Sequence, residues 1–83
     1  MDVREKIRNF ISAELMHKGT TATVDNTDSL LERGILDSLG LLRVLAFLEQ
    51  EYQLKVRDED VIPENFESVN TITALVERYG TRG

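Results

Sequence analysis

The sequence predicts an all-α fold, a bundle of three main helices and one short helix with a long first loop. Apolar residues recur every three or four positions in three separate segments, and nowhere do they alternate with polar residues as a half-buried strand requires. Glycine follows the first and the last of these segments, where helices often end. A chain of 83 residues is expected to form one domain, residues 1–83, around one modest core.

The first helix is predicted over residues 3–17, with Asp2 as its cap and Gly19 at its end. Residues 18–37 are rich in Thr, Asp, Asn and Gly and show no period, which predicts a long loop. We expect this loop to be pinned to the core by apolar residues and to contain a single helical turn near residues 29–33. The apolar helix face comprises Val3, Ile7, Phe10, Ile11 and Leu15, and the loop anchors are Leu30, Leu31, Ile35 and Leu36.

The second main helix, predicted over residues 39–52, has two apolar faces. The first helix and the loops can cover one of these faces. The other is covered either by the long loop or by another protein, and the pattern leaves this alternative open. The expected core face comprises Leu41, Val44, Leu45, Leu48 and Tyr52, and the opposite face comprises Leu39, Leu42 and Ala46.

The last third of the chain predicts a short helix that begins at Pro63, with Phe66 as its inward residue. The last main helix is expected over residues 71–79, capped by Asn70 and ended by Gly80. Val69 is expected to pack on Ala74 before its first turn, and the inward residues are Ile72, Leu75, Val76 and Tyr79.

Composition and charge exclude several classes of protein. The chain has no Cys, which excludes a disulfide scaffold, a thiolate metal site and a cysteine nucleophile. No apolar run approaches the ~20 residues of a membrane span, and the charged N-terminus does not resemble a signal sequence, so we expect a soluble cytoplasmic protein. The net charge of −5 argues against nucleic acid binding. It favours a partner with a basic surface, or it serves solubility alone.

Catalytic and metal-binding residues are not evident. His17 is the only histidine and is expected to be solvated at a helix end. No serine lies in a recognisable catalytic-triad pattern, and the many carboxylates are expected to lie on the solvated surface. The acids at 58–60 resemble a calcium loop only briefly, because Pro63 and Val69 occupy the positions where such a loop needs Gly and Glu. The sequence therefore does not predict an enzyme.

The stretch "GILDSLGLL", residues 34–42, raises a different question about Ser38. Ser38 can cap the second helix by accepting a hydrogen bond from the amide of Leu41, and Asp37 can do the same for Gly40. The helix needs only one N-cap residue, so either Asp37 or Ser38 is not required for capping. The pattern alone leaves Ser38 either as a cap or as a functional residue.

The longer stretch "LLERGILDSLGLLRVLAFLEQEY" resembles the phosphopantetheine attachment segment of acyl and peptidyl carrier proteins. Gly34, Asp37, Ser38 and Leu39 match the family motif, and the loops and helices correspond over essentially the whole chain. The resemblance implies a carrier-protein bundle in which the Ser38 hydroxyl is joined by a phosphodiester to 4′-phosphopantetheine from coenzyme A. The thiol of that arm would hold an acyl or aminoacyl group as a thioester. The amides at the N-terminus of the second helix suit the phosphate.

The resemblance also implies a docking face on the second helix. Its apolar contacts would be Leu39, Leu42 and Ala46, and its polar rim would be Arg43, Glu49 and Gln50. The implied partners are a phosphopantetheinyl transferase, a loading ligase and a downstream acyl-accepting enzyme. The chain itself is expected to be a monomer.

Three departures from fatty-acid synthase carriers indicate a freestanding carrier loaded by an AMP-forming acyl or aminoacyl ligase. Two residues, not one, separate Gly34 from Asp37. Gly40 and Arg43 stand where those carriers often have acids, and a reversed charge weakens docking to basic surfaces. We expect a small or polar cargo that stays outside the bundle, because the aromatic side chains can fill much of a small core. These are Phe10, Phe47, Tyr52, Phe66 and Tyr79.

The alternative function is that of a non-catalytic helical adaptor, which binds a partner through the outer face of the second helix without a prosthetic group. Only the carrier function requires the Ser38 hydroxyl. Replacing Ser38 by Ala therefore distinguishes the two functions.

Overall fold

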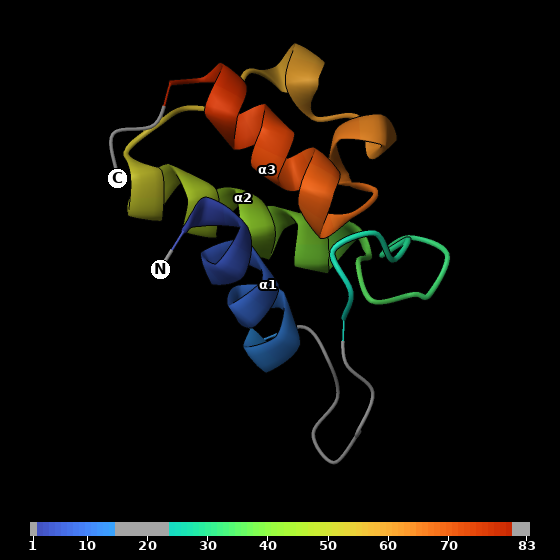
Figure 1. The fold of residues 1–83 in the computed structure, drawn as a ribbon. Coiled ribbons are helices and arrows are strands. Elements are labelled where there is room, and N and C mark those ends of the chain that lie inside the picture. Colours follow the sequence, from blue (N-terminus) through green and yellow to red (C-terminus); the bar gives the residue numbers. More distant parts are fainter. Residues whose placement is uncertain (1, 15–23, 81–83) are drawn as a thin grey trace.

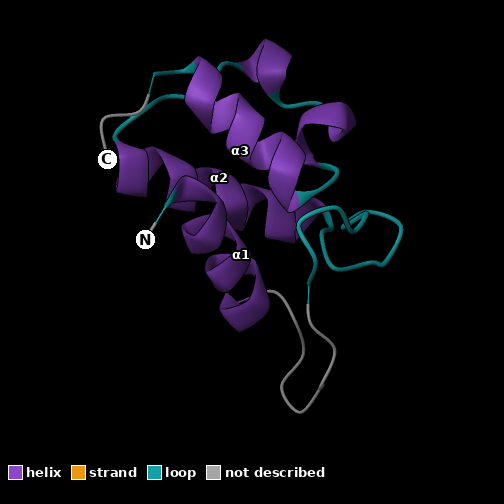
Figure 2. Cartoon of the chain, viewed as in Figure 1, coloured by secondary structure: helices purple, strands orange, loops and turns teal. Residues whose placement is uncertain are grey.

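The computed structural model describes residues 2–14 and 24–80. Within this part of the chain the regular elements are all helices, as predicted (Figure 1; Figure 2). No helix among the described residues has the length and apolar character needed to cross a membrane. The elements are, in chain order, α1 (Val3–Glu14), α2 (Ser38–Tyr52), the 3-10 helices η1 (Asp58–Asp60) and η2 (Pro63–Phe66), and α3 (Val69–Arg78).

Helix α1 begins where the sequence predicts. Asp2 Oδ1 accepts a hydrogen bond from the amide of Glu5 at 2.8 Å, which confirms Asp2 as the cap. Ile7 and Ile11 are fully buried against the core. The predicted continuation of this helix to residue 17 and its end at Gly19 lie outside the described residues.

The described part of the long first loop, residues 24–37, is pinned to the start of α3. The amide of Leu30 donates to the carbonyl of Glu67 at 2.7 Å, and the amide of Asn70 donates to the carbonyl of Asn26 at 3.0 Å. These backbone bonds satisfy polar groups that a loop lying on the core would otherwise leave unpaired. The apolar anchors behave unequally, because Leu30 and Leu36 are buried, Ile35 is half-buried, and Leu31 is 41% exposed.

Helix α2 packs one of its apolar faces and exposes the other. Val44, Leu48 and Tyr52 are buried, and the other two predicted core residues, Leu41 and Leu45, are half-buried against them. On the opposite face Leu39 is 67% exposed and Leu42 is 62% exposed. The described part of the long loop, residues 24–37, therefore does not cover this face.

Helix α3 begins two residues earlier than predicted. Ser68, not Asn70, is its cap: the Ser68 hydroxyl accepts from the amide of Thr71, and the Thr71 hydroxyl accepts from the amide of Ser68. This reciprocal capping box satisfies two amides at once, whereas Asn70 lies within the first turn. The staple predicted between Val69 and Ala74 is also wrong, because it needs Val69 to precede the cap, and Val69 is instead the first residue of the helix.

The core lies where α1, α2 and α3 meet the anchored loop and η2. It holds fewer aromatic rings than the sequence suggests. Phe66 and Tyr52 are buried, whereas Phe10, Phe47 and Tyr79 are only half-buried at its edge. The buried aliphatic residues are Ile7, Ile11, Val24, Leu30, Leu36, Val44, Leu48, Val56, Val69, Ile72, Leu75 and Val76.

The hydroxyl of Tyr52 is buried and finds no hydrogen-bond partner among the described residues. Burial also raises the pKa of this phenol above its ordinary value. We expect Tyr52→Phe to leave the free energy of unfolding unchanged or to raise it by about 1 kcal/mol, because the variant removes an unpaired polar group. Urea denaturation monitored by circular dichroism measures the change. A loss of more than about 1 kcal/mol would show that the hydroxyl has a partner after all.

Candidate functional site

The loop leading to Ser38 is shaped by a glycine in the left-handed conformation. Gly34 has φ +71°, which other residues adopt only with strain, and it closes a single turn in which the amide of Arg33 donates to the carbonyl of Ser29. The predicted turn near residues 29–33 is thereby confirmed. The amide of Leu36 then donates to the carbonyl of Leu30, and the buried Leu36 side chain anchors the chain directly before the motif.

Asp37 is the cap of α2. Its backbone is extended, its Oδ1 accepts from the amide of Gly40 at 2.7 Å, and its carbonyl accepts from the amide of Leu41 at 2.8 Å. Ser38 is the first helical residue and does not cap the helix, so the cap interpretation of Ser38 is wrong. Its side chain is exposed and makes no hydrogen bond within the described part of the chain.

Ser38 lies at the edge of a groove, which we call the Ser38 groove, with a volume of about 280 Å³. The loop before α2 forms one wall and the segment that includes η2 forms the other. Leu31 and Ile62, each 41% exposed, are partly open to solvent. The residues that line the groove are Leu31, Leu36, Asp37, Ser38, Leu41, Val61, Ile62, Pro63 and Phe66.

These residues fit a phosphopantetheine group attached as an ester. An exposed hydroxyl in the first turn of a helix is accessible to a modifying enzyme, and the helix N-terminus favours a phosphate. The Asp37 side chain takes one of the amides expected to be free, that of Gly40, whereas the amide of Leu41 makes the first backbone hydrogen bond of the helix, to the Asp37 carbonyl. The amides of Ser38 and Leu39 are the two that remain for a phosphate, and the Asp37 carboxylate repels a second negative charge.

Most of the residues predicted for the docking face are exposed along one side of α2. Leu39, Leu42 and Ala46 form an apolar strip directly after Ser38, and Arg43 and Gln50 lie beside it. The Arg43 guanidinium bonds the carboxylate of Glu14 at 3.1 Å and its carbonyl at 3.2 Å, which ties α2 to the end of α1.

Glu49 differs from the other predicted rim residues. It is half-buried, and its Oε2 accepts a hydrogen bond from the amide of Val56 at 3.2 Å. This bond satisfies a backbone donor in the connection that follows α2. Glu49 is thus engaged within the fold, and its side chain is not freely presented to a partner as Gln50 is.

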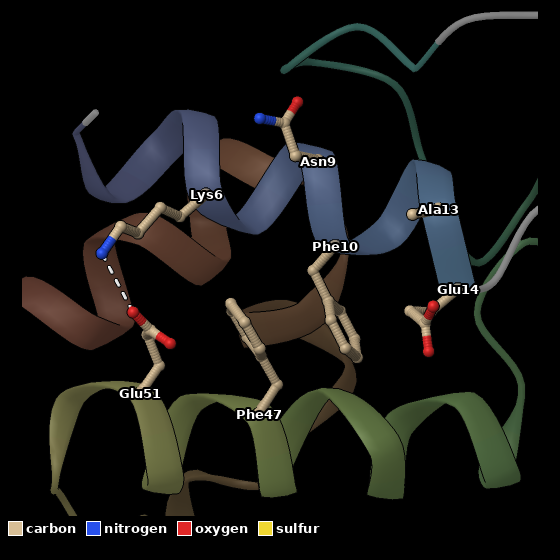
Figure 3. A pocket seen from close by; sticks show the side chains of 7 residues that line it. All are labelled: Lys6, Asn9, Phe10, Ala13, Glu14, Phe47 and Glu51. Carbon is tan, nitrogen blue, oxygen red and sulfur yellow. Dashed lines mark hydrogen bonds and ion pairs between the residues drawn. The ribbon is translucent and has the colours of Figure 1, made fainter.

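The sequence did not predict a second groove, between α1 and α2 (Figure 3). Phe10 and Phe47 both line it and stack between the two helices with ring centroids 4.3 Å apart, and Lys6 forms an ion pair with Glu51 across the same groove at 2.9 Å. The hydrogen bond to Glu51 raises the pKa of Lys6. Both rings were expected in the core, but each lies on the flank of its helix, and only the packing of the two helices shows that they meet at the surface.

Residues 5–78 match a protein family described as "Phosphopantetheine attachment site". The chain belongs to this family. It is therefore a carrier of acyl groups and not an enzyme, and it carries 4′-phosphopantetheine as a covalently attached group.

Two curated relatives resemble this carrier over nearly its whole length. A probable acyl carrier protein, PigG, of Serratia sp. (strain ATCC 39006) is 29% identical over 76 residues, which are 92% of this chain and 86% of the relative. A D-alanyl carrier protein of Streptococcus suis (strain 98HAH33) is 32% identical over 76 residues, which are 92% of each chain. The carrier thus resembles proteins named for both acyl and aminoacyl cargo.

Two solved structures have the same fold. A chain in a structure titled as an FAD-dependent dehydrogenase is 38% identical with a TM-score of 0.76, and the match covers 84% of this carrier and 97% of that chain. A chain in the Bradyrhizobium japonicum glycine:[carrier protein] ligase complexed with glycylated carrier protein is 27% identical with a TM-score of 0.71, over 89% and 99% of the two chains. The likeness confirms the all-α carrier fold.

Proposed function

We propose that this carrier holds an acyl or aminoacyl group on a 4′-phosphopantetheine arm attached to Ser38, accepts it from an AMP-forming ligase and passes it to a downstream enzyme. The observation that supports this most strongly is the exposed Ser38 hydroxyl at the start of α2. Asp37 performs the capping that Ser38 could have performed, so the hydroxyl is not needed for the fold. When bound, the group supplies a thiol that holds the cargo as a thioester.

The residues around Ser38 have separable roles in this proposal. Asp37 holds the start of α2 in place, and the exposed strip of Leu39, Leu42 and Ala46 contacts the transferase and the ligase. Large exposed apolar residues next to a reaction site are typical of protein interfaces. Arg43 and Gln50 form the polar rim, and Glu49 contributes less because it already bonds Val56.

An AMP-forming aminoacyl ligase as the loading enzyme is supported by the charge of this face. Between Ser38 and Phe47 the exposed residues of α2 include Arg43 and no carboxylate. Such a face lacks the acids that pair with a basic docking surface. The glycine ligase complexed with a glycylated carrier provides a structural parallel.

The size of the Ser38 groove supports a small cargo. Pockets that enclose drug-sized ligands commonly measure ~300–1,000 Å³. The Ser38 groove, at about 280 Å³, lies just below this range and is open to solvent, which favours a small cargo at this groove. We also propose that the carrier is cytoplasmic, because the ligase and the transferase use ATP and coenzyme A. We propose separately that it acts as a monomer.

Loading by a ligase tests this function. The phosphopantetheine form of the chain is incubated with ATP, the glycine:[carrier protein] ligase and a panel of small amino acids, and intact-protein mass spectrometry follows the products. We expect the addition of one aminoacyl group, removable by hydroxylamine as a thioester is. The apo chain treated in the same way is the matched control. Equal labelling of the apo and modified chains would contradict the proposal, because it would show that the arm is not used.

The exposed leucines of α2 also support the alternative function, that of an adaptor that binds a partner without the arm. Leu39 and Leu42 are each more than 60% exposed, and neighbouring exposed apolar residues are typical of an interface. The adaptor requires the outer face of α2 but not the Ser38 hydroxyl. The Ser38→Ala experiment described in the Discussion separates the two functions.

A further inference from the structure

The hydroxyl of Tyr79, just after α3, makes two hydrogen bonds to the segment that follows α2. It accepts from the amide of Arg57 at 2.8 Å and donates to Asp60 Oδ2 at 2.6 Å. A short bond from a phenol to a carboxylate is a strong, charge-assisted one. A single side chain therefore holds both ends of the segment 57–60, which includes η1.

Further bonds extend this network toward η2. The side-chain amide of Asn65 donates to the carbonyl of Asp60 at 2.8 Å, and Arg78 donates to Asn65 Oδ1 at 3.2 Å. Asp60 therefore accepts two hydrogen bonds, one from Tyr79 at its carboxylate and one from Asn65 at its carbonyl. The network ties η1 and η2 to the C-terminal end of α3, and Figure 1 shows both short helices beside α3.

The residues that follow Asp60 are Val61, Ile62 and Pro63, and all three line the Ser38 groove. Val61 is half-buried, whereas Ile62 is exposed and the amide of Asn65 donates to its carbonyl at 3.0 Å. Phe66 anchors the η2 end of this wall in the core, and Val61 packs against the core. Before Val61, the residues of η1 are not buried, so the position of this end of the wall depends on the polar network behind it.

We propose that Tyr79 is a positioning residue for the Ser38 groove: its hydroxyl fixes residues 57–60, and through them it holds Val61 and Ile62 as the wall beside Ser38. The proposal rests on the proposed function, in which enzymes dock around Ser38. A wall held in one position is already arranged for docking. A wall that samples several positions lowers the fraction of competent molecules and raises the apparent dissociation constant in inverse proportion.

Tyr79→Phe tests the role of the hydroxyl while keeping the ring that packs on the core. The assay is modification of the apo chain by a broad-specificity phosphopantetheinyl transferase with coenzyme A, with the chain as the varied substrate. We expect KM to rise about fivefold and kcat to stay unchanged, because Ser38 and its cap are untouched. Hydrogen exchange is expected to accelerate at residues 58–62 and to stay unchanged in α2.

Tyr52→Phe is the matched control, because it removes a phenol hydroxyl that has no partner among the described residues. It is expected to leave KM and the exchange of residues 58–62 unchanged. Asp60→Ala removes one acceptor of the Tyr79 hydroxyl, and the effects of Tyr79→Phe and Asp60→Ala on KM should not multiply in the double variant.

Two results would overturn the inference: equal KM values for Tyr79→Phe and Tyr52→Phe, or effects of Tyr79→Phe and Asp60→Ala that multiply independently. Failure of the proposed function looks different, because the unaltered chain would then gain no phosphopantetheine at all. The exchange measurement does not depend on modification. Unchanged exchange at residues 58–62 in Tyr79→Phe would also count against the inference.

Discussion

Ser38→Ala is expected to abolish phosphopantetheine attachment completely. Incubated with coenzyme A and a broad-specificity transferase, the unaltered chain should gain the mass of one phosphopantetheine, and the variant should gain none. The physical reason is that attachment needs a hydroxyl oxygen to form the phosphodiester, and alanine has none. Intact-protein mass spectrometry measures the outcome directly.

Ser38→Ala is expected to remove the hydroxyl without disturbing the fold. Asp37, not Ser38, accepts the bond from Gly40, so the cap of α2 is retained in the variant. Because Ser38 is exposed, we expect the free energy of unfolding to change by no more than about 0.5 kcal/mol. Asp37→Ala is the informative comparison, since it removes the cap and should cost about 1 kcal/mol.

The same variant separates the carrier from the adaptor. If Ser38→Ala still gains phosphopantetheine, another residue is the attachment site. If neither chain gains it while both remain helical by circular dichroism, the adaptor function is supported. In that case partner binding through α2 should survive the substitution.

Leu42→Asp is expected to have the second-largest effect, at least a tenfold rise in the KM of the loading ligase for the phosphopantetheine form of the carrier. Leu42 is 62% exposed and lies on the apolar strip that follows Ser38. A carboxylate buried at the centre of an interface pays a desolvation cost, and loss of an interface anchor commonly costs more than about 1 kcal/mol, with ~1.4 kcal/mol for each tenfold change. Steady-state kinetics with the carrier as the varied substrate measure the effect.

The matched control for Leu42→Asp is Ala74→Asp, which adds the same charge on the exposed face of α3. It should leave the KM of the ligase unchanged. Both side chains are exposed, so we expect each substitution to lower the free energy of unfolding by no more than about 1 kcal/mol, mainly through the poor helix propensity of Asp. A similar rise in KM for both variants would mean that the added charge acts at long range and that the strip on α2 is not the docking face.

Residues close together in the chain account for what could be predicted from the sequence. The apolar spacing of Ile7 and Ile11, or of Val44 and Leu48, reports a buried helix face, since side chains three or four apart share one side of a helix. Gly34 and the stretch around Ser38 carry the family resemblance in the sequence alone. The apolar spacing and the motif around Ser38 are local signals, so they can be recognised without knowing how the helices pack.

The choice between competing local signals needed the backbone. Asp37 and Ser38 are both good caps, and only the extended conformation of Asp37 decides which residue precedes the helix. The same holds for α3, where Ser68 and Asn70 competed and the Thr71 hydroxyl completed the capping box with Ser68. The N-cap preferences of Asp, Ser and Asn are too similar to choose between the candidates at either helix.

The sequence by itself determined that this chain is an all-α carrier with Ser38 as the candidate attachment residue, because periodicity and a short motif encode both. Only the tertiary structure decided that Leu39 and Leu42 are exposed, that Phe10 and Phe47 meet at a surface groove, and that the Tyr79 hydroxyl bonds Arg57 and Asp60. Each of these depends on segments far apart in the chain. Their contacts follow from how the helices pack together, and no local pattern records that arrangement.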